Sequence, residues 1–168
     1  ELLHIFQEIR IQELSFIMLV ITYFGSVTTT ITVTALSSLS FYIHKQKTEV
    51  VRLLVSVCGS SLSVLFIKAV VAAPRPIEEA LYSEITSSFP SGHATIAMSL
   101  YGFLLWHVHK QKKQRFKTLL IATLAILIIL LGVSRLDLGV HYLSEVLVGY
   151  IVGFIWLSVS LGILRPKS

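Results

Sequence analysis

The chain consists largely of long apolar blocks that are almost free of charged side chains. Of its 168 residues, 54% are hydrophobic and 14% are charged, whereas soluble proteins have about 25% charged residues. The mean hydropathy is +0.80. A helix needs about 17–25 residues to cross a bilayer core, and five blocks have that length: 26–43, 50–73, 93–109, 118–134 and 142–164. The sequence therefore predicts an all-α, polytopic transmembrane helix bundle and excludes a water-soluble globule.

The first block is rich in Thr and Ser, and by propensity alone it could pass for a strand. We expect a helix, because an open strand cannot satisfy its backbone hydrogen bonds in lipid. Residues 1–25 differ, since charged side chains there alternate with apolar ones, which predicts an amphipathic helix along the membrane interface. Gly25 marks a bend into the first span. We expect one domain over 1–168, with an interfacial segment over 1–25 and the bundle over 26–164.

Positive charge is concentrated at a few places between the apolar blocks. The loops 44–52 and 107–117 and the C-terminal tail hold ten of the fourteen Lys and Arg residues. With five spans these three segments lie on one side, which the positive-inside rule predicts to be cytoplasmic. We therefore expect a multi-pass protein of the cell membrane. Since topology accounts for most of the net charge of +5, the charge does not indicate nucleic-acid binding.

The other four cationic residues fall near the opposite, extracytoplasmic face: Arg10, Lys68, Arg75 and Arg135. A cation near the end of an apolar span normally has a partner or a role. For Lys68 the alternative is an anchor at the lipid headgroups. Arg75 follows seven residues after Lys68, and its planar guanidinium suits phosphate oxygens.

The tetrapeptide Pro90-Ser91-Gly92-His93 stands where a loop enters the third block. Ser91 is a good N-cap, and Gly92 lets a ligand approach the backbone closely. The free N–H groups of a helix start form an anion site. The alternative is a capped helix without a ligand, but a histidine placed directly at this position favours the anion site.

A second histidine, His141, opens the fifth block shortly after Ser134-Arg135. His141 and Glu145 are four residues apart, so on a helix they share one face. A carboxylate that accepts from one ring nitrogen fixes the tautomer and leaves the other nitrogen free to attack. Asp137 is also four residues from His141 and stays open as the orienting acid, although Gly139 argues against a continuous helix between them.

We expect neither a metal nor another cofactor. No Cys, His and carboxylate residues show the spacing of a ligand set, because the glutamates of the loop 77–84 have no matching histidine pair. Cys58 is the only cysteine, so the chain cannot form an internal disulfide. We assign no function to the other histidines, His4, His44, His107 and His109.

These stretches resemble the three-part signature of the type 2 phosphatidic acid phosphatase (PAP2) superfamily. The first part is a Lys, six residues and Arg-Pro, which here is Lys68 to Arg75-Pro76; the second is Pro90 to His93; the third is Ser134-Arg135 with His141 and then Glu145. Glu145 stands where the family usually has Asp, which puts the efficiency of the reaction in doubt. Membrane members often have six spans. A short form and a span lost upstream of Glu1 are both open.

The resemblance implies a metal-independent hydrolase of phosphomonoesters or diphosphates. It implies that His141 attacks phosphorus to form a phosphohistidine while Glu145 holds its ring. His93 would protonate the leaving oxygen and then activate water. The resemblance also implies phosphate binding by Lys68, Arg75, Ser91, Gly92 and Arg135.

A site between spans at the outer membrane face predicts a lipid substrate whose tail stays in the bilayer. The candidates are undecaprenyl diphosphate, phosphatidylglycerol phosphate and phosphatidic acid. A lipid phosphotransferase that uses the same site is one alternative. The other is a catalytically silent protein that binds or transports a lipid phosphate.

Overall fold

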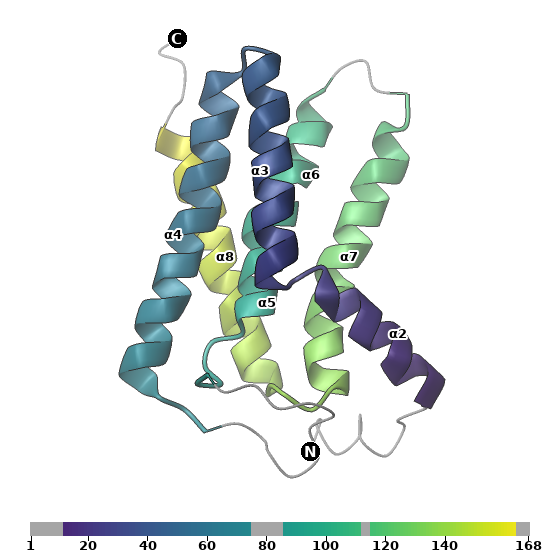
Figure 1. Cartoon of the computed structure of the whole chain (residues 1–168), viewed down its shortest axis with the longest axis vertical. Helices are drawn as coiled ribbons and strands as arrows, with labels where there is room; N and C mark the ends of the chain where they lie inside the picture. The colour runs from purple at the N-terminus through teal and green to yellow at the C-terminus, as the bar shows by residue number, and fades with distance from the viewer. Residues whose placement is uncertain (1–11, 75–85, 112–114, 164–168) are drawn as a thin grey trace.

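The computed structural model describes residues 12–74, 86–111 and 115–163, and all its regular elements there are helical (Figure 1). This confirms the prediction of an all-α membrane bundle. The elements in chain order are α2 (Gln12–Tyr23), α3 (Val27–Ile43), α4 (Lys47–Val71), α5 (Gly92–Ile96), the π-helical turn η1 (Ala97–Tyr101), α6 (Gly102–Lys110), α7 (Lys117–Asp137) and α8 (Leu143–Ile163).

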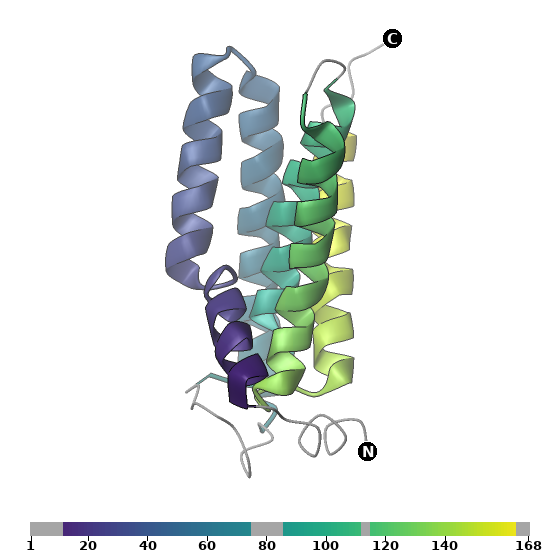
Figure 2. The ribbon, with the colours of Figure 1, turned by 90° about the vertical axis from the view of Figure 1, so that its right-hand side faces the viewer.

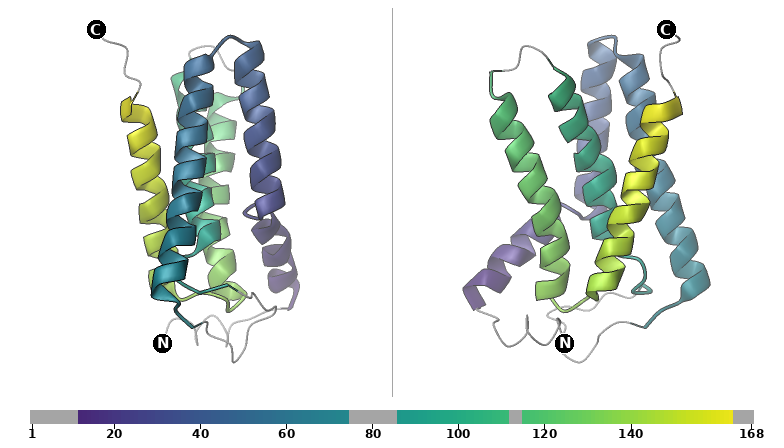
Figure 3. Two further views of the ribbon diagram at one scale, coloured as in Figure 1. Left: turned by 60° about the vertical axis from the view of Figure 1, so that its left-hand side comes forward. Right: turned by 180° about the vertical axis from the view of Figure 1, so that it is seen from behind.

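The elements α5, η1 and α6 follow one another without a gap and form one central column. Figures 2 and 3 show this column inside the bundle, where it packs against α4, α7 and α8. Its side chains Leu100 and Phe103 are fully buried with Leu53 of α4 and Leu131 of α7. The core of the protein therefore surrounds the column, and whatever fixes the column also fixes the residues at its start.

Two hydrogen-bond contacts fix the position of the column along the axis of its neighbour α4. The Ser56 hydroxyl donates to the Ser99 carbonyl of η1 at 2.9 Å, and the Ser60 hydroxyl donates to the Ser99 hydroxyl at 2.9 Å. A π-turn disturbs the regular helical ladder, and here hydroxyls from α4 bond to a residue inside the turn. Because all three residues are buried, a shift of the column along α4 would leave polar groups without partners.

Two glycines on α8 let the start of the column approach closely. A methyl group on Gly149 would lie 2.6 Å from the Ser91 carbonyl oxygen, and one on Gly153 would lie 2.5 Å from that of Thr95. Small residues four apart on a helix permit close backbone contact in membrane bundles. The first turn of α5 is thereby held directly against α8.

By length and composition, α4, α7 and α8 can each cross a membrane. The segments Leu14–Tyr23 and Val27–Ile43, bent by 48°, make a fourth span if they count as one. The other two predicted spans, 26–43 and 93–109, correspond to α3, which at 17 residues is at the lower limit of length for a span, and to the column, which consists of three consecutive elements. The outward faces are apolar, and Val27 is 75% exposed, as suits contact with lipid.

The predicted interfacial helix is described only from residue 12 onward, as α2; residues 1–11 lie outside the described residues. The predicted grouping of the charged loops is visible in Figure 1. The α3–α4 turn and the ends of α6 and α7 that their connection joins lie at one end of the bundle. The end of α4, the start of α5 and the α7–α8 turn lie at the other. The predicted phosphate-handling residues that the structure describes belong to that second end.

Candidate active site

The turn between α7 and α8 places both Arg135 and His141. Gly139 has a φ of 69°, in the left-handed region where glycine is favoured. Its N–H donates to the Leu136 carbonyl at 3.0 Å, and the Val140 N–H donates to the Arg135 carbonyl at 3.3 Å. This pair of bonds is a Schellman motif, which ends a helix and redirects the chain. It leaves Arg135 in the last turn of α7 and delivers His141 to the start of α8.

His141 and Glu145 form a buried pair, with the two side chains 1% and 6% exposed. The His141 Nδ1 lies 2.8 Å from Glu145 Oε2, and the Tyr142 N–H donates to the same oxygen at 3.1 Å. Glu145 lies in the first turn of α8, where the helix dipole favours a carboxylate. When Nδ1 donates to the carboxylate, Nε2 keeps its lone pair. Of the two candidate acids, Glu145 therefore contacts the ring nitrogen; Asp137 is buried at the end of α7.

The second oxygen of the carboxylate has a partner that sequence reasoning missed. The Ser88 hydroxyl donates to Glu145 Oε1, and Ser88 is fully buried. Both oxygens of Glu145 are thus used, one for the histidine and one for the loop that leads into α5. The sequence gives no signal that distinguishes Ser88 from its neighbour Ser87.

The start of α5 has the cap that the sequence predicts. The Ser91 hydroxyl accepts from the Ala94 N–H at 3.4 Å, and the Ser91 N–H donates to the Glu145 carbonyl at 3.1 Å. The same glutamate thus contacts His141 with its side chain and Ser91 with its backbone. This backbone contact therefore holds Ser91, Gly92 and His93 at the same end of the bundle as the buried pair of His141 and Glu145.

Arg135 is fully buried, and its Nη1 donates to the Thr22 hydroxyl of α2 at 2.7 Å. Thr22 is the second residue that sequence reasoning missed. It is a single polar residue at the end of an apolar stretch, 113 positions from Arg135, and no periodicity indicates the contact. A fully buried cation is costly without hydrogen bonds, so this contact stabilises Arg135 in place.

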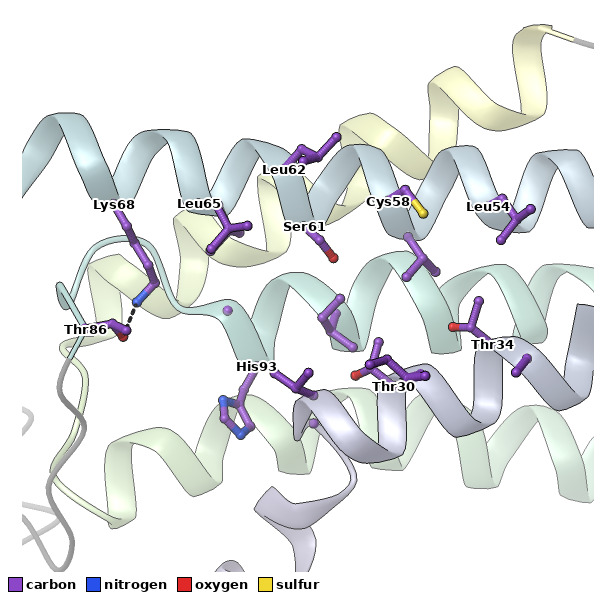
Figure 4. Close-up of a pocket in the computed structure, with 18 of the residues that line it drawn as sticks. Thr30, Thr34, Leu54, Cys58, Ser61, Leu62, Leu65, Lys68, Thr86 and His93 are labelled. Carbon is purple, nitrogen blue, oxygen red and sulfur yellow. Dashed lines mark hydrogen bonds between the residues drawn. The ribbon is translucent and has the colours of Figure 1, made fainter.

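Lys68 lies in the last turn of α4 and reaches back over the loop before α5. Its Nζ donates to the Ser87 carbonyl and to the Thr86 hydroxyl, the latter at 3.4 Å. Figure 4 shows Lys68 and His93 pointing toward the same space from different elements. Arg75, the remaining predicted phosphate ligand, lies outside the described residues.

A cavity of about 910 Å³ opens between α3, α4 and α5. Lys68, Gly92 and His93 line one end of it, and the groove extends along the helices toward Thr34 and Leu54 (Figure 4). Most of its wall between these ends is apolar or weakly polar: Gly25, Val27, Thr30, Ile31, Ala35, Val57, Cys58, Ser61, Leu62, Val64, Leu65 and Ile96. An apolar groove that ends in a cation and an imidazole matches the shape of a lipid with an anionic head.

The arrangement brings two imidazoles, two cations and one carboxylate to one end of the bundle. The positively charged groups of Lys68 and Arg135 suit the oxygens of an anion, as does the N-terminus of the column at α5. Within the described ranges, no group of three or more Cys, His and carboxylate side chains is placed to hold a metal ion.

The sequence pattern that defines the PAP2 superfamily matches residues 49–167. Over 85 residues the chain is 35% identical to phosphatidylglycerophosphatase B of Bacillus subtilis (strain 168). The aligned region covers 48% of this chain and 41% of that protein. The match thus spans only about two fifths of that relative's length.

Two solved structures share the fold. The PAP2-type phosphatidylglycerolphosphate phosphatase of Bacillus subtilis aligns with a TM-score of 0.88 and 23% identity over 99% of this chain and 86% of that one. LpxE of Aquifex aeolicus aligns with a TM-score of 0.77 and 22% identity over 95% and 92%. Because the superfamily pattern covers most of the chain and the bundle has the same fold as these structures, the protein belongs to the PAP2 superfamily.

Proposed function

We propose that the protein is a membrane lipid phosphatase that cleaves a lipid phosphomonoester or diphosphate through a phosphohistidine on His141. The observation behind this proposal is the buried His141–Glu145 pair, which a backbone hydrogen bond ties to the start of α5. When Nδ1 of His141 donates to the carboxylate, the lone pair of the ring is on Nε2. Lys68, His93 and Arg135 belong to elements that meet at the same end of the bundle. Membership of the PAP2 superfamily supports the same chemistry.

In the proposed reaction, the Nε2 of His141 attacks phosphorus, the N–P bond forms and the bond from phosphorus to the lipid oxygen breaks. His93 gives its proton to that oxygen, which leaves as the lipid product. His93 then takes a proton from water, whose oxygen attacks phosphorus and breaks the N–P bond to release phosphate. Acid–base help of this kind is worth about 10²–10⁴-fold in rate.

Lys68, Arg135, the Ser91 hydroxyl and the Gly92 N–H hold the phosphoryl oxygens in this proposal, together with Arg75. Charge accumulates on these oxygens as phosphorus is attacked, so donors fixed in advance stabilise the transition state. The support is that Arg135 is fully buried and hydrogen-bonded, and that Lys68 lies in the last turn of α4, at the end of the groove.

The groove supports a lipid substrate, since its apolar wall suits a hydrocarbon tail while the head lies between Lys68 and His93. Among the candidate lipids we place phosphatidylglycerol phosphate first, because a relative at 35% identity is a phosphatidylglycerophosphatase. Undecaprenyl diphosphate comes second. We also propose that the site faces the extracytoplasmic side, because the cationic turns lie at the opposite end of the bundle.

The first test measures phosphate release by the purified protein from phosphatidylglycerol phosphate, undecaprenyl diphosphate and phosphatidic acid, with EDTA present and no acceptor added. We expect release from at least one lipid at an undiminished rate, because the proposed nucleophile is an imidazole. Loss of activity in EDTA that a divalent ion restores would overturn the metal-independent mechanism. Turnover that needs an added acceptor lipid would instead indicate a phosphotransferase.

The second test concerns the glutamate where the family usually has aspartate. The Glu145 carboxylate meets His141 through one oxygen and Ser88 through the other, so a side chain shorter by one methylene cannot keep both contacts. We therefore expect Glu145→Asp to lower kcat by about ten- to a hundredfold, the usual effect of disturbing a residue that orients a reacting group.

Its matched control is Glu49→Asp. Glu49 pairs with Arg52 in the first turn of α4, at the far end of the bundle, so this substitution should leave kcat unchanged. An equal or higher kcat for Glu145→Asp would show that the length of this side chain does not set the position of His141.

A further inference from the structure

We infer that the joint between α2 and α3, residues 22–26, is part of the active site, where Thr22 and Gly25 act as positioning residues for Arg135 and His93. This inference rests on the proposed function. The joint is the bend of 48° between the two helices. Three other elements contact this joint: α7 through Arg135, η1 through Tyr101 and α5 through His93.

The first contact fixes the buried cation. The Arg135 guanidinium donates to the Thr22 hydroxyl at 2.7 Å, and both residues are buried. A hydroxyl is a neutral acceptor, so it sets the orientation of the guanidinium without cancelling its charge. Because the guanidinium is planar and rigid, fixing its Nη1 also fixes the plane in which its other N–H groups lie.

The second contact limits where the imidazole of His93 can lie. A methyl group on Gly25 would lie 2.5 Å from His93 Cδ2 and 3.1 Å from Cγ. The ring therefore packs directly on the Gly25 backbone, and any larger residue at position 25 must displace it. Proton transfer requires that the His93 ring lie within hydrogen-bond reach of the lipid oxygen. The packing of the ring on Gly25 therefore affects the reaction step rather than the binding of the substrate.

The joint is itself rigidly built, which is what a positioning element needs. The Gly25 N–H donates to the Thr22 carbonyl at 2.9 Å, and the Thr29 hydroxyl donates to the Tyr23 carbonyl at 2.9 Å. Ser26 caps α3 by accepting from the Thr29 N–H at 3.2 Å. The Tyr101 hydroxyl donates to the Phe24 carbonyl at 2.6 Å, which ties the joint to the central column.

The test for Thr22 compares Thr22→Val, which keeps the shape without the acceptor, with Thr22→Ser, which keeps the hydroxyl. We expect Thr22→Val to weaken binding of inorganic phosphate, measured by calorimetry, and to raise KM for the lipid, each by about tenfold. Thr22→Ser should restore both values. A purely structural role would lower the melting temperature without changing phosphate affinity per folded molecule.

The test for Gly25 compares Gly25→Ala with Gly162→Ala, because a methyl group on Gly162 meets no atom within 4 Å. We expect Gly25→Ala to lower kcat by about 10²-fold while KM changes little, since a small displacement of a reacting group has an effect of that size. Gly162→Ala should behave as the wild type in both kcat and melting temperature.

Wild-type values for Thr22→Val, or equal defects in Thr22→Val and Thr22→Ser, would overturn the role of Thr22. A Gly25→Ala variant that matches Gly162→Ala would overturn the role of Gly25. A wild-type protein that releases phosphate from no lipid overturns the proposed function instead. In that case the role of Thr22 is still decided by calorimetry with inorganic phosphate, and that of Gly25 by the change in the imidazole NMR signals of His93 between the two alanine variants.

Discussion

A His141→Asn variant should release lipid phosphate at least about 10⁴-fold more slowly than the wild type, because it lacks the atom that attacks phosphorus. The amide nitrogen of asparagine takes the place of Nδ1 and can still donate to Glu145 Oε2, which Nδ1 meets at 2.8 Å in the structure. The buried carboxylate then keeps a partner, and the fold is preserved. Only the group in the position of Nε2 is lost.

Two measurements separate this chemical loss from a folding defect. Rapid acid-free quenching with a ³²P-labelled substrate should trap labelled wild-type protein, whose phosphoramidate bond is acid-labile and alkali-stable, and no labelled variant. The matched control is His109→Asn, since His109 is exposed near the end of α6 that lies away from the site. This control should keep full activity.

A His141→Asn variant that still releases phosphate at a comparable rate would contradict the phosphohistidine mechanism. If instead the variant releases no phosphate and a strain that depends on this protein still grows normally with it, the silent lipid-binding or transport function is favoured. The measurement of phosphate release tests the reaction, whereas the growth of the strain tests what the cell requires of the protein.

The elements that hydropathy predicts best are those whose length is set by the bilayer. The block 118–134 corresponds to α7 and the block 142–164 to α8, each within a few residues. The block 93–109 corresponds to the continuous column from α5 to α6, but the π-turn inside it could not be read from hydropathy. It depends on contacts of Ser99 with α4, which are tertiary and leave no periodic pattern.

The arrangement of the candidate site residues was predictable to the extent that spacing determines it. His141 and Glu145 meet because four residues form one helical turn, and Ser91 caps α5 because it precedes the apolar run. Counting the predicted membrane crossings between them then placed Lys68, His93 and Arg135 at the same end of the bundle. Each of these inferences uses only local geometry or the count of membrane crossings.

Thr22 and Ser88 could not be found in this way. Each makes a single hydrogen bond to a site residue that is 113 or 57 positions away, and their order in the chain does not indicate the pairing. Thr22 reaches Arg135 because α2 packs on α7, a contact between helices that are far apart in the chain. Contacts between distant elements are therefore harder to predict than contacts within one helical turn, because they exist only in the packed bundle.

A His93→Asn variant should separate the two halves of the reaction. We expect steady-state turnover to fall by about 10²–10⁴-fold, because His93 acts first as the acid and then as the base. The two halves differ in how much they need the acid, since a lipid alkoxide is a far stronger base than a lipid phosphate. Formation of the phosphohistidine should therefore survive better with a diphosphate lipid than with a monoester.

The measurement is rapid-mixing kinetics with undecaprenyl diphosphate as the substrate. The variant should release undecaprenyl phosphate in a burst that equals the amount of protein, while labelled protein accumulates because no base activates water. With phosphatidylglycerol phosphate the burst should be slow or missing, since expulsion of the alkoxide needs the proton from His93. Equal losses on both lipids without labelled protein would mean that His93 only binds the head group, and the assignment of His93 as acid and base would be wrong.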